Sequence, residues 1–403
     1  MSENLIRYAV VGGAGAMGRI TVRDLVETLP SRNVEILIAD YDLKQASALA
    51  EQFRDPRVRA IRVDVKNQAE SQKLLAGSFV LINAAQYSLN LDVMAIALAI
   101  SSHYIDLGGL FHVTRQQLEW DSRFKAIGKT ALLGMGAAPG ITNILARHAS
   151  DRLDTIKEIH LRVGSMDATR YRTQPALALS YSLQTILEEF SFEPAVFTKG
   201  KFKFVAPMSG ATPHRFPAPI GLRHPMYTIH SEVATLPLSF KRQGVQEVSF
   251  KIAFDPEFID RVRFLRDLGM ASHEWITLPG GGKARPIDVI NRVAMSQPAP
   301  KQVGKLNQYE VVRAVVKGTL GRKKVTLIHE CHTAGMPQWG IGLDIDTGSP
   351  PSIAAQMLAR GEITERGALP AEIAVPPLLF FEYLKARNMK IKTVQKSGWE
   401  FKV

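Results

Sequence analysis

The 403-residue sequence contains a single cysteine, Cys331, which rules out an internal disulfide and any cysteine-rich zinc site. No apolar run approaches the ~20 residues that a membrane-spanning helix requires. The first residues show no basic segment followed by a long apolar core, so we expect no signal peptide. Internal repeats and low-complexity segments are also absent. These absences favour a globular protein of the reducing cytoplasm with no membrane partner.

The charge balance is positive, with 50 Lys and Arg against 38 Asp and Glu and a formal net charge of +12. The basic residues are dispersed along the chain. Because the sequence has no aromatic RNA-binding signature or zinc-finger spacing, we expect no nucleic-acid partner. A surface rich in lysine and arginine accounts for the charge, and its field attracts anions such as dinucleotides and carboxylates.

A glycine cluster follows the first apolar run, Tyr8–Val11, and precedes an amphipathic stretch. Strand, glycine turn and helix in this order are typical of a dinucleotide-binding unit with the pattern G-x-G-x-x-G. The first glycine of the pattern allows the tight turn, the second lets the backbone approach the pyrophosphate, and the third packs helix on strand. The N–H groups of the first helical turn then receive the pyrophosphate. The residues predicted for this role are Gly13, Gly15, Ala16, Met17 and Gly18.

A second apolar run ends at Asp40, at the spacing that the dinucleotide fingerprint requires. A carboxylate there accepts hydrogen bonds from the adenosine ribose and repels a 2′-phosphate, so we expect NAD, with NADP less favoured. Tyr41 and Asp42 could share this role. The alternative is that Asp40 only caps the next helix.

Two later strand ends supply further candidate cofactor contacts. Asp64 and Val65 follow an alternating segment and are predicted to lie beside the adenine, although Asp64 could instead cap the following helix. The next short apolar run leads into a segment with small residues that let the backbone approach a ribose and an aromatic residue that could reach the nicotinamide. The candidates in this segment are Asn83, Ala84, Ala85 and Tyr87.

The pattern of elements predicts an α/β fold. Strands and helices alternate through roughly the first 135 residues, and the strands are apolar throughout, as in a parallel, doubly wound sheet covered on both faces. From about residue 151 the strands alternate strictly, which indicates a separate α+β domain with a long proline- and histidine-rich loop, 207–225. We therefore predict a Rossmann domain at 1–140, completed by 345–403, and a substrate-binding and oligomerisation domain at 141–344.

Glycines precede a helix again at Gly136–Gly140. We interpret this helix start as a site for a substrate carboxylate, and a plain turn between domains is the alternative. Arginine binds carboxylates in bidentate fashion, which makes Arg223 a second candidate. The residues predicted to bind substrate are Gly108, Gly109, Pro139, Gly140, Asn143, Tyr181, Ser182 and Arg223.

Several stretches together resemble the saccharopine dehydrogenase family, and the likeness is closest to its lysine 6-dehydrogenase branch. They are GGAGAMG at 12–18, NAAQY at 83–87, YIDLGG at 104–109, GAAPGITNILA at 136–146 and the segment 349–376. The resemblance implies hydride transfer between NAD(P) and a carbon that bears nitrogen, in a homodimer or larger homo-oligomer. It favours oxidative deamination of L-lysine to the semialdehyde or cyclic imine. Reductive condensation of an amine with a carbonyl, as in saccharopine- or carboxynorspermidine-forming relatives, is the alternative, and a non-catalytic dinucleotide sensor is the third hypothesis.

Amine oxidation needs a group that removes a proton before hydride leaves. Asp106, at a strand end near the expected nicotinamide, is one candidate, and a structural carboxylate holding the Gly108–Gly109 turn is the alternative. His230 and Glu232 are a candidate acid–base pair, although a solvated loop histidine is the commoner case. The segment 329–332, His-Glu-Cys-His, resembles a metal site, but in a strand positions three apart point to opposite faces, so we expect no metal.

Overall fold

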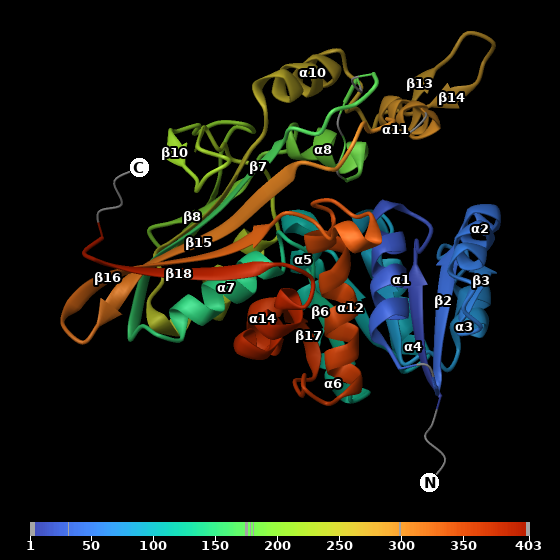
Figure 1. Cartoon of the computed structure of the whole chain (residues 1–403), viewed down its shortest axis with the longest axis horizontal. Helices are drawn as coiled ribbons and strands as arrows, with labels where there is room; N and C mark the ends of the chain where they lie inside the picture. The colour runs from blue at the N-terminus through green and yellow to red at the C-terminus, as the bar shows by residue number, and fades with distance from the viewer. Residues whose placement is uncertain are drawn as a thin grey trace.

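A computed structural model describes residues 5–30, 32–173, 176–177, 179, 181–297 and 300–399 (Figure 1). The first domain is built on a seven-stranded sheet with the order β17-β6-β5-β4-β1-β2-β3, in which every pair is parallel. This arrangement confirms the predicted α/β fold with a doubly wound parallel sheet. Its strands are β1 (Ile6–Val11), β2 (Val34–Asp40), β3 (Val58–Arg62), β4 (Val80–Asn83), β5 (His103–Asp106), β6 (Thr130–Leu133) and β17 (Gly367–Pro370).

Helices cover both faces of this sheet, which is why its central strands are buried, whereas the edge strand β3 is only partly buried. Val10 and Ile82 lie in one core cluster, whereas Ala9, Val11 and Leu81 lie in another. Because neighbouring residues of a strand point to opposite faces, both faces are buried. The first-domain helices are α1 (Ala16–Thr28), α2 (Leu43–Phe53), α3 (Gln68–Leu75), η1 (Tyr87–Leu89), α4 (Asn90–Ala99), α5 (Leu110–Leu118) and α6 (Asp121–Ala126).

The second domain is built on another seven-stranded sheet, with the order β18-β16-β15-β7-β12-β8-β9. It is mixed, since β12 pairs with β7 in parallel and the other pairs are antiparallel. Its strands are β7 (Thr155–Asp167), β8 (Ala195–Thr198), β9 (Lys201–Phe204), β12 (Glu247–Ala253), β15 (Gln308–Leu320), β16 (Lys323–Thr333) and β18 (Lys390–Ser397).

One face of the second sheet packs on α7, which lies between this sheet and the first domain, whereas β10 lies over the opposite, outer face (Figure 1). Leu161 and Val163 of β7 belong to the same core cluster as Ile144 of α7, so Arg162 between them points to the outer face. The remaining elements of this domain are α7 (Ile141–Ser150), α8 (Leu183–Glu189), β10 (His214–Arg215), β11 (Leu222–Arg223), α9 (Glu232–Ser239), η2 (Lys241–Gln243), α10 (Pro256–Asp267), β13 (Ile276–Thr277), β14 (Lys283–Ala284) and α11 (Pro286–Ser296).

The C-terminal segment returns to the first domain and then leaves it. Helix α12 packs on α1, and β17 pairs with β6. The last strand, β18, instead pairs with β16 at the edge of the second sheet, so the predicted assignment of all of 345–403 to the first domain needs correction. The elements of this segment outside the sheets are η3 (Pro337–Trp339), α12 (Ile345–Ala359), α13 (Ala371–Ala374) and α14 (Pro377–Lys385).

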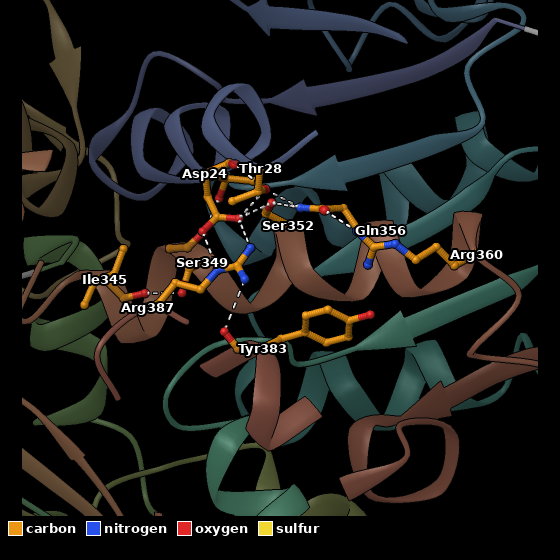
Figure 2. A network of polar contacts seen from close by, with 11 residues as sticks. Asp24, Thr28, Ile345, Ser349, Ser352, Gln356, Arg360, Tyr383 and Arg387 are labelled. Atoms are coloured by element: carbon orange, nitrogen blue, oxygen red, sulfur yellow. Dashed lines mark hydrogen bonds and ion pairs between the residues drawn. The ribbon is translucent and has the colours of Figure 1, made fainter. Parts of the chain in front are cut away.

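A buried polar network fixes α12 and the end of α14 to α1 (Figure 2). Both Asp24 oxygens accept from Arg387, at 2.9 and 2.8 Å, and Ser352 donates to Asp24 at 2.6 Å. One turn further along, Gln356 donates to Thr28 at 2.7 Å. These bonds hold the returning segment against the helix that starts at the glycine turn. Within the described part of the chain, no helix combines the length and apolar character needed to cross a membrane.

Candidate functional site

The glycine turn between β1 and α1 differs from the prediction at one position. The left-handed conformation is at Gly12, with φ of 70°, and not at Gly13, to which the tight turn was assigned. A Cβ on Gly12 would lie 2.7 Å from the Ala85 backbone nitrogen, and a Cβ on Gly13 would lie 2.8 Å from the Val10 carbonyl oxygen. Gly12 therefore makes the turn, whereas Gly13 allows the close approach to β1.

The other two glycines lie as the dinucleotide fingerprint requires. A Cβ on Gly18 would collide with the Gly12 carbonyl oxygen, so this glycine permits the packing of α1 on the turn. Gly15 is exposed, caps α1 without a side chain, and is followed by the exposed Ala16. The first turn of α1 also carries no acidic side chain. An open helix N-terminus of this kind fits the pyrophosphate of a nicotinamide dinucleotide.

Asp40 lies at the end of β2, directly beside this turn. Its Oδ2 accepts from the Ala14 N–H and its Oδ1 from the Asp42 N–H, both at 3.0 Å. The cap of α2 is Asp42, whose carboxylate accepts from the Gln45 N–H at 3.1 Å. Asp40 is thus not the helix cap that the alternative assumed, and its half-buried carboxylate lies where a ribose diol would approach.

Two residues predicted to contact the adenine and ribose, Asp64 and Asn83, form hydrogen bonds within the protein. Asn67 caps α3, so Asp64 does not; Asp64 accepts from the Lys66 N–H at 3.0 Å, and Val65 is buried. Asn83 is 1% exposed and donates to Asn90 at 2.8 Å.

The Asn83 side chain also shapes the loop that follows β4, because its Oδ1 accepts from the Ala85 N–H at 3.2 Å. Ala84 and Ala85 are half-buried, and the Ala85 nitrogen lies against the glycine turn. This placement leaves the backbone of the loop next to the expected cofactor path.

Asp106, at the end of β5, is fully buried, and each of its oxygens accepts two hydrogen bonds. Oδ1 accepts from the N–H groups of Gly108 and Gly134, at 2.9 and 2.8 Å. Oδ2 accepts from the Tyr104 hydroxyl at 2.9 Å and the Gln117 amide at 2.5 Å. These contacts fit the alternative interpretation of Asp106, a structural carboxylate that holds the Gly108–Gly109 turn, because four hydrogen bonds occupy the lone pairs that would accept a substrate proton.

His230 lies in a buried acid–base cluster at the junction of the two domains. Its Nδ1 is 3.1 Å from Glu232 Oε2, and its Nε2 is 3.6 Å from Glu189 Oε1. The ring stacks on Phe250, with 3.7 Å between the centroids. Burial alone would lower the pKa of His230, but Glu232 and Glu189 outweigh it and raise the pKa to about 9. At neutral pH this imidazole is therefore a cation that can donate a proton.

A contact between the domains places this cluster opposite the end of the first sheet: the Gly109 N–H donates to Ser231 Oγ at 3.3 Å. Within the second domain, Thr142 of α7 donates to Glu232 Oε1 at 2.9 Å. Tyr87 lies near Glu188, and burial together with Glu188 and Glu189 raises its pKa. The predicted residues Tyr87, Gly109 and Glu232 are thus brought to one junction.

The same junction holds further carboxyl groups that the sequence did not single out. Burial raises the pKa of Glu188, whose Oε1 lies 3.0 Å from His273. Glu310 of β15 faces Asp344 and Asp346 at the start of α12. Burial, Glu189 and Glu310 raise the pKa of Tyr181, whose hydroxyl donates to Glu189 at 2.7 Å.

Desolvation raises the pKa of each carboxyl in this second group. The pKa of Asp346 rises to about 6, and that of Asp344 to about 7 with a further contribution from Asp346. The pKa of Glu310 rises well above its ordinary value. In the described part of the chain, no lysine or arginine nitrogen lies within 4.0 Å of the carboxyl oxygens of Glu310, Asp344 or Asp346. Such a group favours either a retained proton or a bound cation.

The N–H groups at the helix start that follows Gly136–Gly140 are hydrogen-bonded within the protein, so they are not free for a substrate carboxylate. The Gly140 N–H donates to Asn143 at 3.1 Å, and those of Ile141 and Thr142 donate to the carbonyls of Gly136 and Ala137, at 2.9 and 3.1 Å. The Asn143 amide also donates to Glu372 at 2.8 Å. The alternative interpretation, a turn between domains, accounts for these contacts.

The other predicted substrate residues lie in different places. A Cβ on Gly108 would lie 2.8 Å from Pro139, so these two residues form one wall of the junction. Ser182 caps α8, accepting from the Thr185 N–H at 3.4 Å. Arg223 pairs with His214 in the β10–β11 hairpin over the outer face of the second sheet, so the structure does not bring it to the junction.

The segment 329–332 is part of β16, as expected, and its side chains alternate between faces. His329 contacts His148 of α7, with 3.2 Å between the Nδ1 atoms, on the inner face. His332 contacts Tyr309 and Glu330 on the outer face, at 2.9 and 3.0 Å. The two histidines therefore do not converge on one point.

A dinucleotide-binding turn that faces a buried acid–base cluster on a second domain is the arrangement of a nicotinamide-dependent oxidoreductase. Two family models match the chain: the saccharopine dehydrogenase NADP binding domain over residues 9–132 and the saccharopine dehydrogenase C-terminal domain over residues 136–389. The chain belongs to the saccharopine dehydrogenase family, which confirms the family that the sequence motifs suggested.

Among curated relatives, carboxyaminopropylagmatine dehydrogenase of Synechocystis sp. is 22% identical over 90% of this chain and 92% of its own length. Carboxynorspermidine synthase of Vibrio alginolyticus is 21% identical over 69% of this chain and 70% of its own. Neither name supports the predicted lysine 6-dehydrogenase branch. Among solved structures, saccharopine dehydrogenase (L-Glu forming) from Saccharomyces cerevisiae has a TM-score of 0.71 at 16% identity, covering 96% of this chain and 100% of that one, which shows a common fold.

Proposed function

We propose that this protein catalyses the reductive condensation of a cationic amine with a carbonyl compound, with NAD as the favoured cofactor. The observation that carries the proposal is the group of desolvated carboxyls Glu310, Asp344 and Asp346, which Tyr181 and Glu189 connect to a protonated His230. A second cationic group on the amine substrate would complement these carboxyls while its reacting nitrogen points to the nicotinamide.

The protonation state of His230 favours the reductive sense of the reaction. Condensation of an amine with a carbonyl releases water, and the imine formed accepts hydride more readily when it is protonated; both steps need an acid. An imidazole with a pKa of about 9 holds that proton at neutral pH, whereas oxidation of an amine needs a base. We assign proton donation to His230 and control of its pKa to Glu232.

The relatives support the choice of substrate class. One is named for carboxyaminopropylagmatine and the other for carboxynorspermidine, and both names describe a carboxylated side arm on a polyamine or guanidino amine. Oxidative deamination of L-lysine, which the sequence resemblance favoured, is the second candidate, since it uses the same hydride chemistry in the opposite sense.

The bound cofactor would supply or accept the hydride at its nicotinamide ring. Gly15, Ala16, Met17 and Gly18 would hold the pyrophosphate, and Asp40 would accept from the ribose diol, which favours NAD. The family model is named for NADP, so the preference needs a direct measurement. We also propose a homo-oligomer, as the resemblance implies, which light scattering would test, and a cytoplasmic location, which the single cysteine favours.

The deciding experiment follows oxidation of NADH and NADPH with amines and carbonyl compounds, added singly and in pairs. We expect turnover only when agmatine or a short diamine is present with a carboxylate-bearing aldehyde. Reduction of NAD by L-lysine alone, with no turnover of any pair, would replace the proposal by the second candidate. Cofactor binding with no turnover in either direction would instead indicate the dinucleotide sensor.

A variant series separates the two parts of the proposal. Glu310→Gln should raise the KM for the cationic amine at least tenfold and leave the KM of the aldehyde unchanged, because only the amine carries the complementary charge. The matched control is Glu382→Gln, since Glu382 is an exposed carboxyl on α14. An equal rise of both KM values would contradict the assignment of Glu310 to the amine.

A further inference from the structure

The proline- and histidine-rich loop 207–225 covers the outer face of the second sheet. The loop contains the β10–β11 hairpin. Phe216, which is 2% exposed, holds it on β7, since a Cβ on Gly164 would lie 2.7 Å from the Phe216 ring. Lys251 of β12 donates to the Gly210 carbonyl of the same loop. The loop is thus fixed on the outer face of the sheet, whereas His230 stacks on Phe250 on the inner face.

Between the loop and the sheet lies a cavity of about 430 Å³. Its position is on the outer face because Arg162 alternates along β7 with Leu161 and Val163, which pack in the core. The lining residues are His160, Arg162, Thr212, Pro213, His214, Val315 and Lys317. No residue of the glycine turn or of the acid–base cluster takes part.

The residues that line the cavity include two cations, Arg162 and Lys317, and no acidic residue. Arg162 donates to the Leu161 carbonyl at 2.6 Å and to Ser249 at 3.2 Å, both uncharged groups. None of the ion pairs within 4.0 Å in the described ranges includes Arg162, whereas Lys317 is paired with Glu158 at 2.7 Å. Burial lowers the pKa of Arg162 to about 10, and burial and Arg162 together lower that of Lys251 to about 8.

A desolvated arginine without a carboxylate partner is costly unless a counter-ion compensates it. The two histidines of the lining add neutral polar groups, because burial lowers the pKa of His160 to about 4 and of His214 to about 3. His160 is held by Ser249 at 2.8 Å, and His214 accepts from Arg313 at 2.7 Å. The wall therefore offers one guanidinium, one ammonium group and two neutral imidazoles, a set of groups that matches an oxyanion.

A metal ion is the competing occupant. Glu158, His160 and Glu247 place one ligand atom each within 4.8 Å of one another at the edge of this cavity. The Lys317 ammonium already lies 2.7 Å from Glu158 Oε2, and the same oxygen is 3.1 Å from His160 Nε2. A divalent cation would have to displace this ammonium group close to Arg162, which disfavours it.

We propose that this cavity is a second ligand site, which binds a small oxyanion with a carboxylate or phosphate group, separate from the oxidoreductase site. Arg162 is its central ligand, and Lys317 and the loop residue Thr212 complete it. The loop 207–225 is then the cover of an anion site, and its length is explained by that role.

The test is calorimetric titration of the whole protein with inorganic phosphate and with citrate, at constant ionic strength set by chloride. Arg162→Met should weaken binding of the preferred anion at least tenfold, and Arg162→Lys should retain part of it. Arg263→Met on α10, where the arginine is exposed, is the matched control. Comparison of the two anions distinguishes a phosphate from a carboxylate ligand.

The glycine turn also attracts phosphate, so a site-specific signal is needed. The imidazole resonances of His160, assigned with His160→Gln, should shift on titration in the wild type and in Gly15→Val but not in Arg162→Met. Unchanged affinity in Arg162→Met would overturn the proposal. So would stabilisation by Zn²⁺ that Glu158→Gln abolishes, or dimerisation that Arg162→Met abolishes while phosphate has no effect.

Discussion

Arg387 and Asp24 form a bidentate ion pair across 363 residues of sequence, with N–O distances of 2.9 and 2.8 Å. Arg387 follows α14, and Asp24 lies on α1, the helix that begins at the glycine turn (Figure 2). Asp24 is fully buried, and Arg387 is 4% exposed. The geometry of the turn thus depends on a contact with the last part of the chain.

Removing one partner of this pair should cost much more than removing an exposed pair. Arg387→Met leaves a buried carboxylate without its cation, and we expect the free energy of unfolding to fall by about 3–5 kcal/mol in urea denaturation. The control is Lys385→Met, whose ammonium lies 3.9 Å from the exposed Glu382 and should contribute at most ~1 kcal/mol. Similar losses in both variants would show that the buried pair does not anchor the segment.

The glycines of the turn should separate binding from folding. A Cβ on Gly15 would meet only the Gly12 carbonyl oxygen, at 3.1 Å, and the rest of a valine side chain would lie at the exposed start of α1, so we expect loss of cofactor affinity with only a small fall in melting temperature. Gly18→Val collides with the Gly12 carbonyl and should destabilise the fold itself. Gly282→Val, at a position with no atom within 4 Å of the added Cβ, is the control. Undiminished affinity of Gly15→Val for NAD and NADP would remove the pyrophosphate site.

Asp40 should set the choice between the two cofactors. Asp40→Asn removes the charge that repels a 2′-phosphate and keeps an acceptor for the Ala14 N–H, so the affinity ratio of NAD to NADP should fall roughly tenfold. Adding Tyr41→Arg, at an exposed position, should lower the ratio further. Calorimetric titration with both cofactors measures it. A ratio that does not change would show that another residue contacts the ribose.

The first domain was predictable from sequence because its signals are local. Strands β1, β2, β4 and β6 contain apolar runs of a few residues, and the glycine pattern lies between the first of them and an amphipathic stretch. Strand β17 has no such local signal. The conformation of Gly12 was not predictable, since Ala85, on another strand end, forces it. Strand β18 also has no local signal for its sheet: an alternating segment fits any free edge, and its partner β16 lies far earlier in the sequence.

The candidate site was only partly predictable for the same reason. His230 and Glu232 stand two residues apart, so the pair was visible in the sequence, but its environment was not. Glu189, Glu310 and Asp346 come from three segments that are far apart in the sequence, and only the folded chain brings them together. The two neighbouring acids that end the apolar helix α8 were the one local signal, because buried positions rarely carry unpaired carboxyls.

His230 should link activity and stability to pH. Its folded pKa, about 9, lies above the ordinary value of 6.5, so its contribution to stability is complete below pH 6.5 and is lost as the pH rises to 9. The free energy of unfolding of the wild type, relative to His230→Gln, should therefore fall by ~3 kcal/mol across this window in a denaturation series. Asp344 and Lys251, with pKa values of about 7 and about 8, also titrate in this window, which is why the difference between the two proteins is the quantity to measure.

The same proton should control turnover. In the reductive direction the activity of the wild type should decline as the pH rises through about 9, because His230 then loses the proton that it donates. Glu232→Gln removes the main charge that raises this pKa, so the decline should move to lower pH, whereas His230→Gln should lower kcat by ~10²–10⁴-fold without such a limb. Initial rates of cofactor oxidation across pH 6–10 provide the profile. If Glu232→Gln lost activity equally at every pH, the residue would act on the structure of the junction and not through the proton of His230.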